Sequence, residues 1–119
     1  RREATADEMV AIIVRALKEV SLSIGDLAFV AAIDEKANEP TFINASKFLG
    51  VSITTVNRNE LQMVADKIQT HSPRVLALHG VGSLAEATAL ASAGPGASLI
   101  LPRIASDRVT CALARGEPQ

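Results

Sequence analysis

Residues 27–56 read LAFVAAIDEKANEPTFINASKFLGVSITTV, a strand–helix–strand pattern around which the rest of the chain can be arranged. Residues 27–33 form an apolar run that stops at Asp34, which is typical of a strand covered on both faces. Residues 51–56 alternate apolar and polar side chains and are rich in β-branched residues, which predicts a second strand. Between them a helix is expected to begin near Pro40 and to end at Gly50. Its apolar face consists of Phe42, Ala45, Phe48 and Leu49.

A helix is also expected before this unit. Thr5 and Glu8 stand at the spacing of a capping box, in which each side chain accepts a hydrogen bond from the other residue's backbone N–H. The residues that follow place apolar side chains along one helical face. These are Met9, Ile12, Ile13, Ala16, Leu17 and Val20.

The second half of the chain alternates in the same way. Asn57 to Glu60 resembles the start of a helix, and Ser83 with Glu86 is expected to form a second capping box ahead of a helix that ends at Gly94. Residues 73–78 fit either a short helix opened by Ser72 and Pro73 or, over residues 75–78, a buried strand.

Two apolar runs near the C-terminus, residues 98–101 and 109–113, are joined by only seven residues. A helical crossover needs a dozen or more, so the two strands, if paired, are antiparallel. Strands interleaved with helices predict a single α/β domain with a mixed sheet.

Composition narrows the class of protein. The chain has 119 residues, of which 48% are hydrophobic and 21% charged, so a single folded domain is expected. The net charge of −1 and the absence of Trp and Tyr argue against nucleic-acid binding. No apolar run reaches the roughly 18 residues of a membrane span. A lone cysteine indicates a reducing, cytoplasmic setting.

Gly80, Val81, Gly82 and Ser83 begin a G-x-G-x-x-A pattern ahead of a helix, which is the pattern of dinucleotide-binding turns. A dinucleotide is the least favoured interpretation of this pattern, because Pro102 and Arg103 stand where a ribose-binding acid would follow. The pattern is otherwise either a plain turn or a helix N-terminus suited to a carboxylate or phosphate. The carboxylate of Glu86, in the first turn of that helix, would repel a bound anion there unless the capping box engages this carboxylate.

Asp34, Lys36 and Glu39 follow the first strand directly. Ligands of open α/β sheets gather at the carboxyl ends of strands, so these groups are candidates for holding a polar ligand or for acid–base chemistry. The competing interpretation is a solvated loop whose acids cap the helix at Pro40.

The remaining candidates point more weakly to a site. His71 and His79 lack partners at the spacing of metal ligands, so no metal site is expected. Cys111 lies in an apolar run and is expected to be a small buried side chain rather than a nucleophile. Arg103 is a lone cation at the end of a strand.

Read together, four segments resemble the CobE proteins and the C-terminal domain of CbiG, which belong to cobalamin (vitamin B12) biosynthesis. They are residues 32–40 (AIDEKANEP), 80–90 (GVGSLAEATAL), 99–103 (LILPR) and 109–115 (VTCALAR). The resemblance implies a three-layer α/β/α sandwich and a cytoplasmic role in building the corrin ring. CbiG is linked to opening a lactone on a cobalt-precorrin, whereas the chemical role of CobE is less settled.

The resemblance adds weight to one set of ligand-binding candidates: Asp34, Lys36, Glu39, Gly80, Val81, Gly82, Ser83, Glu86, Arg103 and Thr110. Precorrins are macrocycles ringed by carboxylates, so Lys36, Arg103 and the amides at Ser83 suit them. No separate cofactor or metal is expected, since any cobalt would arrive inside the ligand. Other pathway enzymes are possible partners.

The chain departs from the family pattern at two places. The family opens with a strand and a Gly-Ile-Gly-Cys-Arg turn, and both are expected to be missing here. At the position of Arg103 the family usually has a lysine. An arginine keeps the positive charge, but it stays protonated and cannot act as a free amine.

Three hypotheses follow. The first is a corrinoid carrier or accessory protein; the second is a hydrolase or lyase with Glu39 or Asp34 as acid or base; the third, least favoured, is a nucleotide-binding module at residues 80–85.

Overall fold

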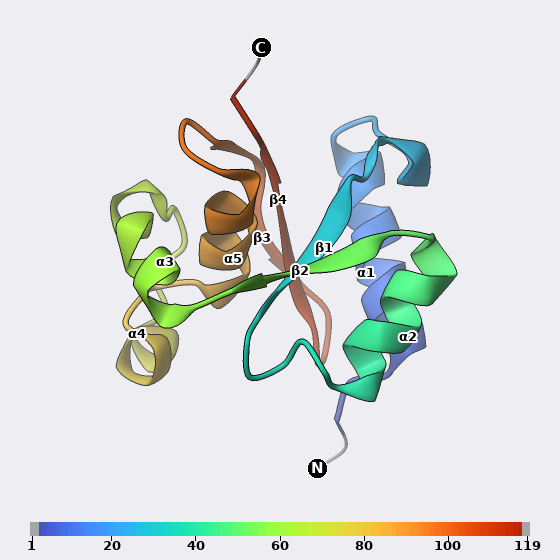
Figure 1. Ribbon diagram of the computed structural model, residues 1–119, viewed down its shortest axis with the longest axis horizontal. Helices are drawn as coiled ribbons and strands as arrows, with labels where there is room; N and C mark the ends of the chain where they lie inside the picture. The colour runs from blue at the N-terminus through green and yellow to red at the C-terminus, as the bar shows by residue number, and fades with distance from the viewer. Residues whose placement is uncertain (1–2, 118–119) are drawn as a thin grey trace.

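The computed structural model describes residues 3–117, which form five helices and four strands (Figure 1). Two single 3₁₀ turns, Ile24–Asp26 and Ala65–Lys67, complete the described elements. In chain order the helices and strands are α1 (Ala6–Glu19), β1 (Phe29–Ile33), α2 (Pro40–Leu49), β2 (Ser52–Val56), α3 (Arg58–Met63), α4 (Pro73–His79), α5 (Leu84–Ala93), β3 (Ser98–Ala105) and β4 (Thr110–Arg115).

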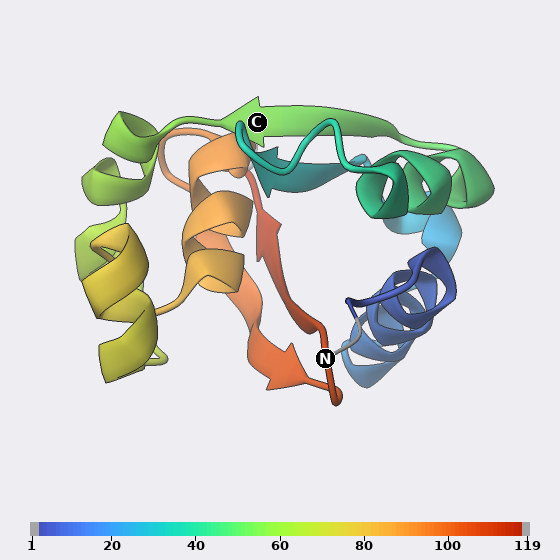
Figure 2. The same ribbon diagram turned by 90° about the horizontal axis from the view of Figure 1, so that it is seen from below.

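The elements form three layers. The strands lie in the middle, α1 and α2 cover one side, and α5 covers the other with α3 and α4 outside it (Figure 2). The α/β class expected from the sequence is confirmed. Both kinds of strand pairing predicted for a mixed sheet occur, but they form two separate two-stranded sheets, β1–β2 and β3–β4.

The first sheet is a parallel pair. β1 and β2 are in register from Phe29 opposite Ser52 to Ile33 opposite Val56. Their connection is α2, so residues 29–56 are the strand–helix–strand unit expected from the sequence, with β1 beginning two residues later than predicted. Gly50 ends α2 with φ of 74°, a left-handed conformation that favours glycine.

The second sheet is antiparallel, as the short link required, but its turn is tighter than predicted. β3 continues to Ala105, so only Ser106 to Val109 connect the strands, closed by a 2.8 Å hydrogen bond from the Ser106 N–H to the Val109 carbonyl. The pairing register shifts between Leu101 and Ile104. Pro102 lies in that interval and has no N–H to donate, which suits an irregular stretch of the ladder.

Residues 73–78, which allowed two interpretations, are helical. Ser72 accepts a hydrogen bond from the Val75 N–H, and Pro73 is the first helical residue. No single helix among the described residues is long and apolar enough to cross a membrane; α4 and α5 meet the length and composition criteria only as a pair bent by 55°.

Two apolar cores flank the strands. One packs α1 against α2 and β4, with Ile12, Ala16, Leu49 and Leu113 buried in it. The other lies beneath α5 and contains Val56, Leu61, Val81 and Leu90. These cores fix α1 and α5 on opposite faces of the strands, which sets the walls of the cavity described below.

The predicted capping box of α1 is present and is joined by a cation from the far end of the chain. Glu8 accepts a 2.8 Å hydrogen bond from the Thr5 N–H, and Arg108 Nε donates to its second oxygen at 3.0 Å. The Arg108 guanidinium and the Thr5 N–H lower the pKa of Glu8 to about 2. The start of α1 is thereby tied to the β3–β4 turn.

This contact makes acid stability depend on Glu8. Because the pKa is lowered from 4.5 in the folded state, the stabilisation is present above 4.5 and is lost as pH falls toward 2. We expect the melting temperature of Glu8→Gln to lie below that of the wild type at pH 6 and the gap to close between pH 4.5 and 2. Glu19→Gln, which removes a distant, exposed partner 3.9 Å from Arg15, is the control. A gap that is unchanged over this range would contradict the role of Glu8.

Candidate functional site

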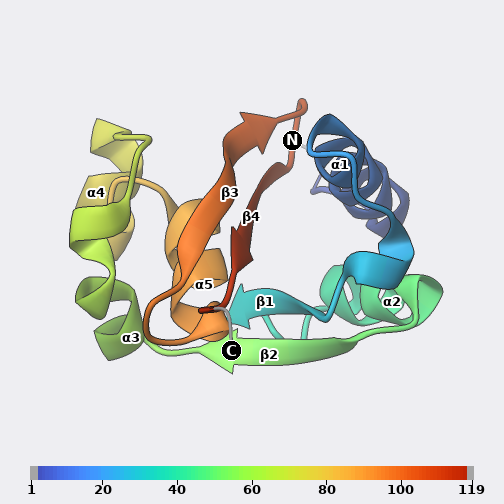
Figure 3. The ribbon, with the colours of Figure 1, turned by 90° about the horizontal axis from the view of Figure 1, so that it is seen from above.

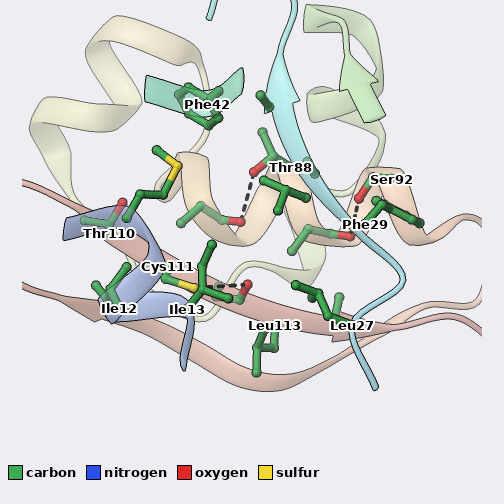
Figure 4. Close-up of a pocket in the computed structure, with 18 of the residues that line it drawn as sticks. Ile12, Ile13, Leu27, Phe29, Phe42, Thr88, Ser92, Thr110, Cys111 and Leu113 are labelled. Carbon is green, nitrogen blue, oxygen red and sulfur yellow. Dashed lines mark hydrogen bonds between the residues drawn. The ribbon is translucent and has the colours of Figure 1, made fainter. Parts of the chain in front are cut away.

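A cavity of about 870 Å³ lies between α1, β1, α5 and β4 (Figure 4). Its interior is mostly apolar. The wall from α1 carries large side chains, among them Ile12 and Ile13, whereas the wall from α5 carries small ones, among them Ala85 and Ala89. The two walls of the cavity therefore differ in the size of their side chains.

The polar groups inside the cavity are already engaged or held neutral. The hydroxyls of Thr88 and Ser92 donate to carbonyls of their own helix at 2.9 and 3.0 Å. Burial raises the pKa of the Cys111 thiol to about 11, so at neutral pH it is a thiol and not a thiolate. This fits the expectation that Cys111 is not a nucleophile.

Six polar residues line the cavity around the carboxyl end of β1, and we call them the rim: Glu3, Lys36, Glu39, Thr41, Arg108 and Thr110. Two contacts bring them to one edge. The Thr41 hydroxyl, in the first turn of α2, donates to the Ala4 carbonyl at 3.1 Å, and Arg108 is bonded to Glu8 in the first turn of α1. The N-termini of α1 and α2 therefore lie side by side at the edge where β1 ends.

Lys36 and Glu39 are positioned by a tight turn after β1. The Lys36 N–H donates to the Ile33 carbonyl at 2.9 Å, and the Glu39 N–H donates to the Lys36 carbonyl at 3.0 Å. Glu39 is the N-cap residue of α2, but its carboxylate makes no capping hydrogen bond. Across residues 3–117 neither side chain forms an ion pair or hydrogen bond, and both are exposed. The interpretation in which Glu39 caps the helix with its side chain is therefore wrong.

Asp34 lies just outside this group. Its N–H donates to the Val56 carbonyl at 3.0 Å, extending the β1–β2 pairing by one residue, and its side chain is exposed. It does not line the cavity. Glu35 faces Arg58 at 3.6 Å across two exposed side chains, so that pair adds little stability.

The glycine pattern at residues 80–85 follows helix α4 and not a strand, so it lacks the context of a dinucleotide-binding turn. Gly80 ends α4 with φ of 77°. A side chain at Gly82 would stand 3.0 Å from the Thr70 carbonyl and from the Cα of His71. Both glycines are thus explained by the path of the backbone, and Val81 is part of a core.

Ser83 and Glu86 were expected to form a capping box, and half of that prediction is wrong. Ser83 does accept a hydrogen bond from the Glu86 N–H at 3.2 Å. The Glu86 carboxylate instead accepts from the Gln69 N–H at 2.7 Å, the Thr70 hydroxyl at 2.6 Å and N–H at 3.1 Å, and the Arg103 N–H at 2.8 Å. Gln69, Thr70 and Arg103 together offer this carboxylate four donors, whereas the helix cap would offer it only the single N–H of Ser83.

Glu86 is fully buried, and its role in the structure is to join three segments. Burial by itself raises the pKa of a carboxyl, but the hydrogen bonds from Arg103, Thr70 and Gln69 outweigh it, so the pKa of Glu86 lies below its ordinary value. A large ligand cannot reach Glu86, Ser83 or Val81 without displacing this packing, since at most 1% of each is exposed. These three predicted site residues support the fold around the site.

The ligand-binding candidates therefore fall into two groups, those that line the cavity at the rim and those that lie away from the rim. Lys36, Glu39 and Thr110 meet at the rim, whereas Gly80, Gly82 and Arg103 do not line the cavity. The Arg103 side chain is exposed on β3. Arg108 was missed by the sequence analysis, and its only signal is a place in the turn two residues before Thr110.

In chemical terms, the rim combines the unengaged ammonium of Lys36, the carboxylates of Glu3 and Glu39, a guanidinium with one partner and the N-terminus of α2. Such a set binds carboxylates and donates hydrogen bonds.

Comparison with known proteins finds likeness over nearly the whole chain. A family model described as cobalamin synthesis G C-terminus matches residues 1–114. The protein CobE of a Sinorhizobium species is 34% identical over 113 residues, covering 95% of this chain and 73% of that protein.

Two solved structures share the fold. The crystal structure of CobE, a protein from the cobalamin biosynthetic pathway, superimposes with a TM-score of 0.87 at 32% identity, over 97% of this chain and 84% of that one. The cobalamin biosynthesis protein chiG of Agrobacterium tumefaciens superimposes with a TM-score of 0.75 at 32% identity, over 99% of this chain and 94% of that one.

Proposed function

The chain belongs to the cobalamin synthesis G C-terminus family and is involved in cobalamin biosynthesis, and from that premise we propose that it binds a carboxylate-rich corrinoid or precorrin intermediate as a carrier or accessory protein. The observation that carries the proposal is the exposed ammonium of Lys36, which has no partner within residues 3–117, at the mouth of an apolar cavity.

The rim suits such a ligand in two ways. Carboxylates around a macrocycle can pair with Lys36 and approach the N-terminus of α2, where backbone N–H groups and the helix dipole favour negative charge. Phe42 lines the cavity next to the rim and supplies an apolar surface for the ring (Figure 4). Glu39 stands beside these groups and can accept hydrogen bonds from the ligand's own polar substituents.

The experiment is an anaerobic absorbance titration of the protein with hydrogenobyrinic acid and with earlier precorrins, followed by mass analysis of the recovered ligand. We expect a spectral shift that saturates and a ligand of unchanged mass, because the rim offers binding groups and no activated nucleophile. The absence of a shift with every compound would overturn the binding proposal.

A second candidate function is hydrolysis or cleavage of a substituent on a precorrin ring, with Glu39 or Asp34 as acid or base. It is favoured by the free carboxylate of Glu39, three residues from Lys36 at the rim. A changed ligand mass in the titration would support it, and the mass difference would identify the bond. Full turnover by Glu39→Gln would exclude Glu39 from the chemistry.

A further inference from the structure

The outer edge of β2 is unpaired. β2 is bonded only to β1, along the edge that faces β1. In Figure 3, β2 lies at the outside of the molecule, on the side of β1 away from β3 and β4, and no other helix or strand of residues 3–117 lies beyond it. Residues of β1 line the cavity, whereas no residue of β2 does. This edge is therefore separate from the candidate site, and an inference about it does not depend on the proposed function.

Four backbone groups point outward from this edge. Consecutive residues of a strand direct their N–H and C=O groups to opposite edges. The Val56 carbonyl accepts from the Asp34 N–H at 3.0 Å, so Val56, and with it Thr54, faces β1. The N–H and C=O groups of Ile53 and Thr55 therefore point away from the sheet. Within the described part of the chain these four groups have no hydrogen-bond partner.

Both ends of this free edge are closed by the protein itself. Before the edge, the Val51 N–H donates to the Ser46 carbonyl at 3.1 Å, at the end of α2. After the edge, the Asn57 N–H donates to the Glu60 carboxylate at 2.9 Å, in the capping box of α3. The free donors and acceptors are thus confined to the short segment of residues 53–55.

From this arrangement we propose that the edge of β2 binds a second copy of this chain, with the two β2 strands antiparallel about a two-fold axis at Thr54. In an antiparallel pair, opposite residues that exchange both hydrogen bonds alternate with opposite residues that exchange none. Ile53 opposite Thr55 of the second copy, and the reverse, satisfies all the free groups of both copies. An axis at Ile53 or at Thr55 would instead require the N–H of Val51 or of Asn57, which is already engaged.

Composition and charge favour a second copy as the partner. Residues 48–57 contain no charged side chain, so two copies of this edge meet without repulsion. Arg58, the first cation after the edge, faces Glu35 at 3.6 Å. At the axis Thr54 meets its own copy, and pairs of threonines are favourable between neighbouring strands.

The edge of β2 also lacks the features that normally keep strand edges apart, which are charge, proline or a bulge. β3 has all three, because Pro102 and the exposed Arg103 lie at its register shift. The Arg103 N–H is in addition engaged by Glu86. Of these two strands, only β2 presents a neutral and regular edge to another chain.

Two exposed apolar side chains lie in the helices that flank β2. Phe48, in the last turn of α2, is 76% exposed, and Met63, at the end of α3, is 80% exposed; no other large apolar side chain described is as exposed as these two. The antiparallel arrangement brings the α2–β2 turn of one copy to the same end of the interface as the β2–α3 turn of the other. Burial of Phe48 and Met63 there would add apolar area to a short strand pairing.

The first test is sedimentation equilibrium of the wild type, Thr55→Pro and Thr55→Val. Proline removes an outward N–H, which the fold tolerates on an edge strand, whereas valine keeps that N–H and the branched side chain. We expect a reversible dimer of the wild type, a dimer of Thr55→Val at least as tight, and a dissociation constant roughly tenfold larger or more for Thr55→Pro. Melting temperatures show that both variants are folded. A wild-type monomer at every concentration, or equal weakening by both substitutions, would overturn the proposal.

The second test fixes the register by cross-linking in a Cys111→Ala background. Two copies of Thr54→Cys meet at the axis with their Cα atoms roughly 4.5 Å apart, which a disulfide spans. The control is Ser52→Cys, on the same strand and face, whose two copies lie roughly 14 Å apart because four residues separate them along the strands. We expect oxidation to link Thr54→Cys into dimers and to leave Ser52→Cys monomeric.

Equal cross-linking of the two cysteine variants would indicate random collision and overturn the proposal. A wild-type dimer in which neither variant cross-links would place the interface elsewhere and also overturn it. A monomer whose β2 amides gain protection from hydrogen exchange only when an extended peptide is added would assign the edge to a different partner instead of a second copy.

Discussion

Replacing Glu86 with alanine is expected to lower the free energy of unfolding by about 3 kcal/mol or more. The carboxylate is fully buried and accepts four hydrogen bonds, from Gln69, from Thr70 twice and from Arg103. Alanine leaves three backbone N–H groups and a hydroxyl without their acceptor. The loss would also release the loop around Gln69 and the irregular part of β3 from α5.

Glutamine at this position should be only slightly better tolerated. Each Glu86 oxygen accepts two hydrogen bonds, so an amide NH₂ in place of either oxygen sets donors against donors. Urea unfolding of Glu86→Gln and Glu86→Ala measures both effects. Glu60→Ala is the control, because it removes an exposed carboxylate that accepts a single hydrogen bond, from the Asn57 N–H in the capping box of α3, and should cost about 1 kcal/mol. A loss below that of the control in both Glu86 variants would contradict the structural role assigned here.

The second large effect concerns binding. We expect Lys36→Glu to weaken the affinity for hydrogenobyrinic acid by roughly 10- to 100-fold, the equivalent of one charge-assisted hydrogen bond replaced by repulsion. Stability should be unaffected, because the Lys36 side chain is exposed and has no ion pair or hydrogen bond within residues 3–117. Equilibrium dialysis of the variant at low salt is the measurement, since exposed charge interactions are screened at high salt.

The matched control for this variant is Lys47→Glu. Lys47 is an exposed lysine in the last turn of α2, at the opposite end of that helix from the rim, so the substitution changes the net charge of the protein equally. The control separates a local contact from long-range steering. If both variants weaken binding to the same extent, Lys36 is not a contact.

Much of the fold could be predicted from local patterns. The parallel unit of residues 29–56 was predictable because a buried apolar run, a helix bounded by Pro40 and Gly50 and a β-branched run leave few alternatives. The capping box of Thr5 and Glu8 was predictable because both partners lie within one turn. The antiparallel pairing of the last two strands followed from the length of their link.

What the sequence could not predict depends on distant contacts. Glu86 leaves its expected partner at Ser83 because Gln69, Thr70 and Arg103 converge on it, and no spacing rule shows that convergence. Arg108 reaches the rim through Glu8, one hundred residues away. In contrast, the grouping of Lys36 and Glu39 at the carboxyl end of β1 was predicted, since that position depends only on where the strand ends.

The central claim, which follows from the proposed function, is that this chain recognises a corrinoid through the carboxylates of that corrinoid. The most direct measurement is a comparison of hydrogenobyrinic acid with its fully methyl-esterified form, in equal solvent and at low salt. The two compounds share the ring and differ in charge. We expect the acid to bind at least tenfold more tightly than the ester, and Lys36→Glu to reduce that preference. Equal affinities of the wild-type protein for the acid and the ester, or tighter binding of the ester, would contradict the account.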